Sequence, residues 1–360
     1  MHEDPAILRE HATARADIAK LHEFEHWPAH WMWPMFIATI ALGGAASVAM
    51  ELCWPLLFVI LPLQSALMFV FVLSFHDASH GRLHPIHRVN EAIGHALGTA
   101  MLTPLNVYRF AHARHHAQLG RPGDPELWPF NSPNVPRLLR VMAAVCEIAF
   151  GFLYTPLLFL RSVFVGNLTH REKQMVMRGY IACICVWTVV MAVVVDFHLW
   201  NKFLILIVTP MAISGAMQTL NKFEQHLGLH GETVLGLTRT VVDRQKFGEL
   251  ISAAMLYNDY HGTHHRYAKI PYYHLPQATP YALSGAREYS PVFPSIVSAS
   301  IDMLHCLIDP KVGPQWNVKK DGANFNVGAS SAVTPIAQPV FTGSYETAAS
   351  ATEAHGAVSK

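Results

Sequence analysis

Four apolar stretches dominate the hydrophobic pattern, each bounded by polar residues. They cover about residues 34–53, 55–75, 179–195 and 203–220. The hydrocarbon core of a bilayer takes roughly 20 residues of helix, so each can span it, the third only at the lower limit. Short connections join the first stretch to the second and the third to the fourth. We therefore expect an all-α membrane protein with four transmembrane helices in two hairpins.

A fifth apolar region, residues 138–165, differs from these four. Glu147, Pro156 and Arg161 interrupt it. A charged side chain inside hydrocarbon is costly, and such residues are rare in spans. We interpret this region as an interfacial or buried helix.

The composition also indicates a membrane protein. Hydrophobic residues make up 51% of the 360 residues and charged residues 14%, against about 25% charged in an average soluble domain. The net charge of +1 gives no reason to expect nucleic acid. The five cysteines have no spacing typical of a disulfide framework, a zinc site or an iron–sulfur site. The N-terminus has no apolar core of a cleavable signal peptide, so we expect the first span to be retained.

The lysine and arginine positions predict an orientation. If the N-terminus is cytoplasmic, the external loops are residues 51–54 and 196–202, and only Lys202 of the 26 lysines and arginines lies outside. Both termini are then cytoplasmic. We expect an N-terminal surface helix (1–30), a membrane domain with a helical cytoplasmic cap (31–305) and a C-terminal segment (306–360) that is disordered from about residue 322.

Histidines recur in three motifs, which we call boxes one, two and three. They read His76-Asp77-Ala78-Ser79-His80, His112-Ala113-Arg114-His115-His116 and His261-Gly262-Thr263-His264-His265. At this histidine frequency chance gives roughly 0.1 HxxHH triplets, yet boxes two and three both have this form. Residues three and four apart share a helix face, so each box projects its imidazoles toward one point. All three boxes fall on the cytoplasmic side of the expected topology.

This pattern predicts a metal centre. Neutral imidazole is a ligand for zinc, copper, iron and nickel. Eight box histidines exceed the three or four protein ligands of a zinc site, so we expect two metal ions. Asp77 stands where an HExxH metalloprotease needs glutamate, which argues against a protease. His22, His26 and His30 share i, i+4 spacing, but they lie beside tryptophans before the first span and we interpret them as interfacial.

These motifs resemble those of the integral-membrane fatty acid desaturase and hydroxylase superfamily. The resemblance covers roughly residues 30 to 290 and rests on the flanks as well as the boxes. The matching segments are HDxxHG at 76–81, RxxHxxHH at 109–116, Asp124-Pro125-Glu126, Thr238-Arg239-Thr240, Asn258-Asp259-Tyr260 before box three, and Leu275-Pro276.

The resemblance implies a histidine-ligated di-iron centre that uses dioxygen to attack an unactivated C–H bond of a lipid chain. It also implies a ninth histidine after the last span, for which His226 is the better candidate and His230 the runner-up. The expected ligands and catalytic residues are His76, His80, His112, His115, His116, His226, His261, His264 and His265. Asp77, Asp124, Glu224 and Asp259 are candidates for orienting them, Asp77 first.

The expected function is that of a lipid acyl-chain desaturase in a bacterial inner membrane, introducing a C=C bond with two external electrons. The sequence has no haem, iron–sulfur or nucleotide-binding motif, so a separate donor of the ferredoxin, cytochrome or rubredoxin type is expected. The alternative is a hydroxylase or ketolase of a lipid or carotenoid. A non-catalytic membrane metal-binding protein is more distant, because the spans carry almost no ionisable residues.

Overall fold

The computed structural model describes residues 14–24, 31–166, 168–243, 245–284 and 290–317. These residues are mainly helical: 14–20, α2 (Met32–Leu52), α3 (Leu57–Ser79), α4 (His87–Ala100), α5 (Leu105–Ala117), α6 (Arg137–Val165), α7 (His170–Asp196), α8 (Trp200–Phe203), α9 (Thr209–His226), α10 (Lys246–Ala254), α11 (His261–Arg266), α12 (Leu275–Ser284) and α13 (Ile296–Leu304). Strands β1 (Thr240–Val241) and β2 (Val292–Phe293) pair in parallel. His26, His30 and the tail expected to be disordered from about residue 322 lie outside the described residues.

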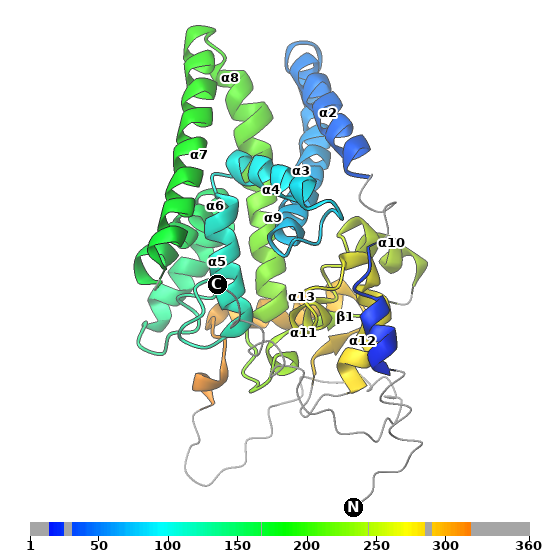
Figure 1. The fold of residues 1–360 in the computed structure, drawn as a ribbon. Coiled ribbons are helices and arrows are strands. Elements are labelled where there is room, and N and C mark those ends of the chain that lie inside the picture. The colour runs from blue at the N-terminus through cyan, green and yellow to red at the C-terminus, as the bar shows by residue number, and fades with distance from the viewer. Residues whose placement is uncertain (1–13, 25–30, 167, 244, 285–289, 318–360) are drawn as a thin grey trace, which may run out of the picture.

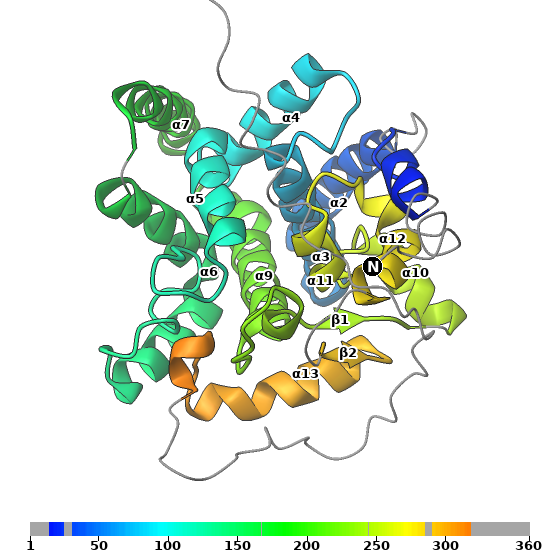
Figure 2. The same ribbon diagram turned by 60° about the horizontal axis from the view of Figure 1, so that its bottom comes forward.

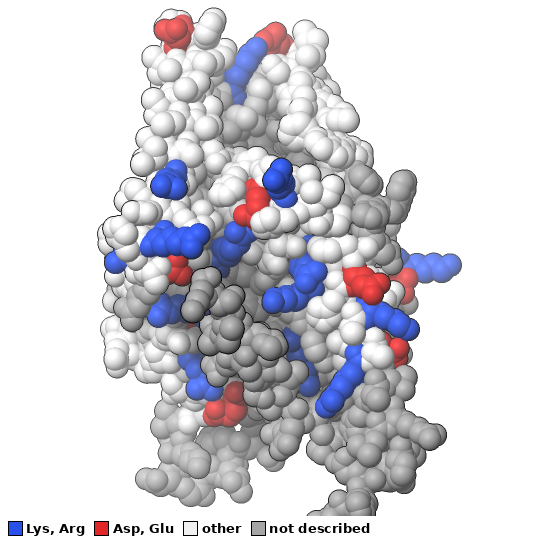
Figure 3. All heavy atoms as spheres, viewed as in Figure 1, with Lys and Arg blue, Asp and Glu red and all other residues white. Residues whose placement is uncertain are grey.

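Two long helical hairpins form one end of the molecule. A 3₁₀ turn, Trp54–Leu56, joins α2 to α3, and α8 with a π-helical turn, Leu204–Val208, joins α7 to α9. Figure 1 shows both connections at the same end of the molecule. Lys202 Nζ lies 3.2 Å from Glu51 Oε1 there, so an ion pair links the two tips. Figure 3 shows charged side chains at this tip and again lower down, with an almost uncharged band between them.

The number of helices that could span a membrane differs from the expected four. Five described helical segments are long and apolar enough: Met32–Leu52, Trp54–Ser79, Arg137–Val165, His170–Asp196 and Trp200–His226. The additional one is α6, whose interruptions do not end the helix. Pro156 lies inside α6, and Phe150 has non-helical backbone angles, so α6 continues across a kink.

The other end of the molecule is a helical cap. Helices α3 and α9 continue beyond their apolar stretches to Ser79 and His226, because cap residues bury their last turns. Figure 2 shows α3, α5, α9 and α11 gathered around one region, with α13 crossing below them in that view. The spans therefore carry box one and His226 into the cap, where boxes two and three lie.

Close packing of α6 against α9 fixes one side of this region. A Cβ added to Gly151 would lie 2.5 Å from the Gly215 carbonyl oxygen, and one added to Gly215 would lie 2.5 Å from Phe152 N. Only glycine permits backbones to approach so closely. Lower along the same pair of helices, Lys222 Nζ of α9 forms an ion pair with the buried Glu147 of α6.

Candidate metal centre

The nine expected histidines come together in two adjacent groups. The first contains five residues, His76, His80, His112, His116 and His264, and the second contains four, His115, His226, His261 and His265. Within each group, one nitrogen from every ring lies within 4.8 Å of the others. The two groups adjoin, since the His116 and His265 rings stack with centroids 4.1 Å apart.

Box two contributes to both groups because its residues occupy two faces of one helix. In α5, His112 and His116 are one turn apart and face the first group, whereas His115 faces the second. Box three, in α11, divides in the same way: His264 joins the first group, and His261 and His265 join the second. The HxxHH spacing therefore serves two neighbouring sites from a single helix.

The Nε2 atoms of several rings are very close. Nε2 of His112 lies 3.0 Å from that of His80 and 3.1 Å from that of His116. In the second group, His261 Nε2 lies 2.9 Å from His226 Nε2 and 3.0 Å from His265 Nε2. Each group thus directs its ring nitrogens at a common point.

Acceptors on the outer side of the rings decide which nitrogen carries the proton. His112 Nδ1–H donates to Glu126 at 2.8 Å, and His115 Nδ1–H donates to Asp124 at 2.8 Å. His226 Nδ1–H donates to the Leu237 carbonyl at 3.0 Å. In a neutral ring the other nitrogen, Nε2, then has a free lone pair. These contacts orient metal ligands in the usual way.

Burial and the other imidazoles favour the neutral form of most of the histidine rings in the two groups. Desolvation first, and neighbouring histidines next, lower the pKa of His80, His112, His116, His261, His264 and His265. At His115, burial also lowers the pKa, but Asp124 and Glu126 outweigh it and the net pKa is raised.

Two features show that this donor set fits metal ions. His76 Nε2 and His264 Nε2 are buried without a hydrogen-bond partner among the described residues. Buried nitrogens normally have partners, and lone pairs at 3 Å repel unless a cation lies between them. Nitrogen ligands of this kind suit iron, zinc or copper.

The remaining candidates occupy other positions. His230 belongs to neither group, so the geometry favours His226 as the ninth histidine. Asp77 Oδ1 lies 3.1 Å from His76 Nδ1, and its role as an orienting acid stays a prediction. Asp259 instead accepts a hydrogen bond from Ser252, and Arg239 binds the backbone of Glu224.

Sequence reasoning missed Glu126 as an orienting acid, although it was noted within Asp124-Pro125-Glu126. Asp124 also accepts from the backbone N–H groups of Gly120 and Glu126, at 3.0 Å each. This folds the loop so that both carboxylates reach α5. The two-residue spacing of acids shortly after box two was the available signal.

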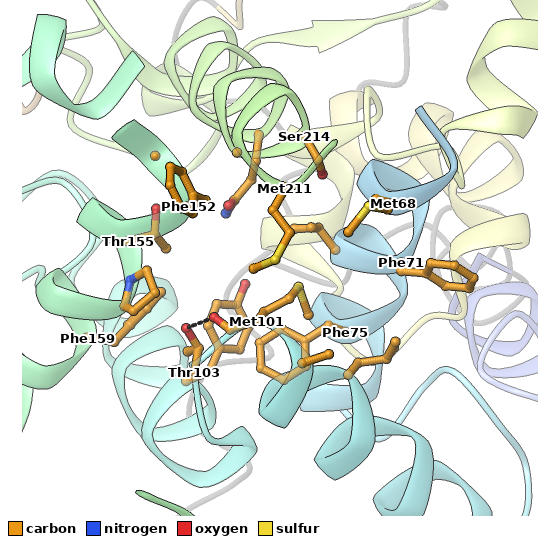
Figure 4. Close-up of a pocket in the computed structure, with 18 residues that line it drawn as sticks. Met68, Phe71, Phe75, Met101, Thr103, Phe152, Thr155, Phe159, Met211 and Ser214 are labelled. Carbon is orange, nitrogen blue, oxygen red and sulfur yellow. Dashed lines mark hydrogen bonds between the residues drawn. The ribbon is translucent and has the colours of Figure 1, made fainter. Parts of the chain in front are cut away.

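An apolar cavity of about 140 Å³ lies beside the first group. Helices α3, α4, α5, α6 and α9 surround it, and Figure 4 shows Phe75, Met101 and Met211 directed toward it. Tyr108 also lines it and stacks on His112 with ring centroids 5.1 Å apart. The cavity wall is thus in direct contact with a candidate ligand.

Comparison with known proteins gives a family. The sequence pattern of the fatty acid desaturase family matches residues 52–296. A chloroplastic sn-2 acyl-lipid omega-3 desaturase (ferredoxin) from Arabidopsis thaliana is 26% identical over 269 residues, 66% of this chain and 56% of the relative. An endoplasmic reticulum omega-3 fatty acid desaturase from Vigna radiata var. radiata is 26% identical over 118 residues, 33% of this chain and 30% of the relative.

A third relative is an endoplasmic reticulum acyl-lipid omega-3 desaturase (cytochrome b5) from Arabidopsis thaliana. It is 32% identical over 93 residues, 26% of this chain and 23% of the relative. The chain thus spans from about a quarter to just over half of the length of these relatives. The family match includes every box residue from His76 to His265, and it covers more than half of the chain. This helical membrane protein therefore belongs to the fatty acid desaturase family.

Proposed function

We propose that this protein is a lipid acyl-chain desaturase that holds two iron ions in its two histidine groups. One observation carries the proposal: two adjacent groups of convergent imidazoles lie in a membrane protein, and an apolar cavity lies beside the first of them. His76, His80, His112, His116 and His264 would hold one ion, and His115, His226, His261 and His265 the other. When bound, the iron ions supply the redox chemistry that activates dioxygen for removing hydrogen from an unactivated chain.

The chain's own residues bind and position the substrate. Burying a methylene group stabilises a complex by about 0.8 kcal/mol, so an apolar cavity favours an acyl chain. Phe75 and Tyr108 lie between the cavity and the first histidine group, since Phe75 precedes His76 and Tyr108 stacks on His112. These rings keep the reacting segment dry and close to the metal centre.

The geometry limits the number of membrane crossings. Box two precedes α6, and His226 ends α9, yet His115 and His226 belong to one group with ring centroids 5.1 Å apart. An even number of crossings must therefore separate them, so α6, α7 and α9 do not all cross. Among the three, α6 carries the buried Glu147 and Arg140, and it lies beside α5 below the hairpin tips in Figure 1.

We therefore propose four spans, α2, α3, α7 and α9 with its preceding turn, and place α6 at the interface. From the distribution of positive residues we also propose that the metal centre and both termini are cytoplasmic, with a bacterial inner membrane as the setting. Electrons come from a separate donor. Two relatives are named for such donors, ferredoxin and cytochrome b5.

Lipid analysis tests this function. The protein is expressed in a host of known lipid composition together with a compatible electron donor, and His264→Ala serves as the inactive control. We expect acyl chains that have lost two hydrogens and gained one double bond, only with the unmodified protein. Chains that gain one oxygen instead would indicate a hydroxylase, and oxidised carotenoids with unchanged acyl chains would indicate a ketolase.

A further inference from the structure

A single turn separates the apolar cavity beside the first histidine group from a second apolar space. The turn follows α4 and contains Met101, Leu102 and Thr103. Met101 and Thr103 line the cavity, whereas Leu102 lines a groove on the other side, along α7. The backbone of the turn is therefore the wall between the two spaces.

The groove runs along α7, one of the four proposed spans. It has a volume of about 820 Å³ and follows α7 from Tyr180 to Asp196. These residues form the apolar part of a helix long enough to span a membrane. Its lining includes Ile184, Trp187 and Thr188, of which Ile184 and Thr188 are exposed. In a membrane the medium in contact with these side chains is lipid hydrocarbon, so the occupant of the groove is an acyl chain.

The wall is held by hydrogen bonds at its two ends. Thr103 N–H donates to the Gly98 carbonyl at 2.8 Å, and the Trp187 indole N–H donates to the Thr99 carbonyl at 2.9 Å. Between them, Leu102 has a φ of 56°. Glycine is the usual residue at such a left-handed position after a helix, because a Cβ is strained there.

A leucine at this position indicates a use for its side chain. Strained backbone positions persist where the surroundings hold them, and they cluster at ligand sites. Here the strained residue is the one that projects into the groove. Leu102 lies between Met101 and Thr103, which line the cavity on the other side of the turn.

From this arrangement, and resting on the proposed function, we propose that substrate acyl chains pass sideways from the bilayer into the cavity. The acyl chain lies first in the groove along α7 and then passes Leu102, the residue at the boundary between the groove and the cavity. Such a route never exposes the chain to water, which is the main cost of moving a lipid. Leu102 thus acts on substrate access and belongs to neither histidine group.

Photolabelling of the full chain in vesicles tests the route. The probe is a phosphatidylcholine with a photoactivatable diazirine in mid-chain, and mass spectrometry locates labelled peptides. Thr188→Phe fills the groove, and Val189→Phe adds the same bulk to the neighbouring exposed residue outside it. We expect Thr188→Phe to reduce the labelling of cavity residues about tenfold. Val189→Phe should leave that labelling unchanged.

A second variant tests the role of Leu102 at the boundary between the groove and the cavity. Leu102→Gly suits the left-handed backbone, so the fold is retained, and it removes the covering side chain. Cavity labelling should then rise several-fold. Equal cavity labelling in the two phenylalanine variants, a wild-type cavity that is never labelled, or no increase in Leu102→Gly would each overturn the proposal.

These outcomes are distinguishable from failure of the proposed function. Labelling needs no metal, electron donor or turnover, so it reports the route even if no desaturated product forms. Conversely, if Thr188→Phe desaturates lipid normally and its cavity is fully labelled, the function holds and the lateral route does not.

Discussion

At the residue scale, spacing along the sequence predicted the eight box histidines of the candidate centre. Residues three and four apart meet on one helix face wherever the helix lies, so the boxes needed no tertiary information. A ninth histidine after the last span was expected from the family resemblance, and the structure brings His226, the better of the two candidates, to the second group. The role of Glu126 depends on how the loop after α5 folds, which local spacing does not determine.

Removing the Glu126 carboxylate should weaken metal binding. Glu126→Ala leaves His112 Nδ1 without its acceptor, and loss of such a partner lowers metal affinity by roughly 10- to 100-fold. Glu126→Gln keeps an oxygen acceptor and should retain most of the affinity. Metal content after dialysis against a graded series of chelator concentrations measures the change.

The control for this pair is Glu249→Ala, which removes an exposed carboxylate on α10. It should leave the retention curve unchanged. If Glu126→Ala kept its metal as firmly as Glu249→Ala, the hydrogen bond to His112 would have no part in holding the metal centre.

At the element scale, apolar length predicted the four long helices but not their inner ends. The last turns of α3 and α9 are polar in sequence, and cap residues bury them. In α6, Glu147 reads as an interruption of an apolar helix. Its partner, Lys222, lies 75 residues away in sequence, so the ion pair is a tertiary contact that local patterns do not reveal.

Breaking this ion pair should destabilise the protein. Glu147→Ala leaves the Lys222 ammonium uncompensated, and removal of one partner of a buried pair costs about 3–5 kcal/mol. The double variant Glu147→Leu with Lys222→Met removes both charges and should recover most of that loss. Thermal unfolding of the purified protein in detergent compares the three proteins. A double variant as unstable as Glu147→Ala would mean that the ion pair is not what holds α6 to α9.

At the scale of the whole molecule, the shared histidine centre constrains the topology more strongly than hydropathy does. Hydropathy and length admit five crossing helices. The contact between His115 and His226 requires an even number of crossings between them. The arrangement of the cap could not be predicted, because its short helices pack through contacts between distant segments.

Labelling from one side of the membrane tests this topology. In a background without the native cysteines, Arg137→Cys marks the start of α6, His170→Cys marks the start of α7 just after the end of α6, and Asn201→Cys marks the hairpin tip. A membrane-impermeant maleimide added to sealed vesicles should react with the first two from the same side and with Asn201→Cys from the other. Reaction of Arg137→Cys and His170→Cys from opposite sides would show that α6 crosses the membrane.

The most direct test of the central claim is the metal content of the fully loaded, purified protein. Nine imidazoles in two groups exceed the needs of one ion, and oxygen-dependent desaturation needs a redox metal. Elemental analysis should therefore find about two iron ions per chain. A chain that binds one zinc ion and no iron would contradict the account.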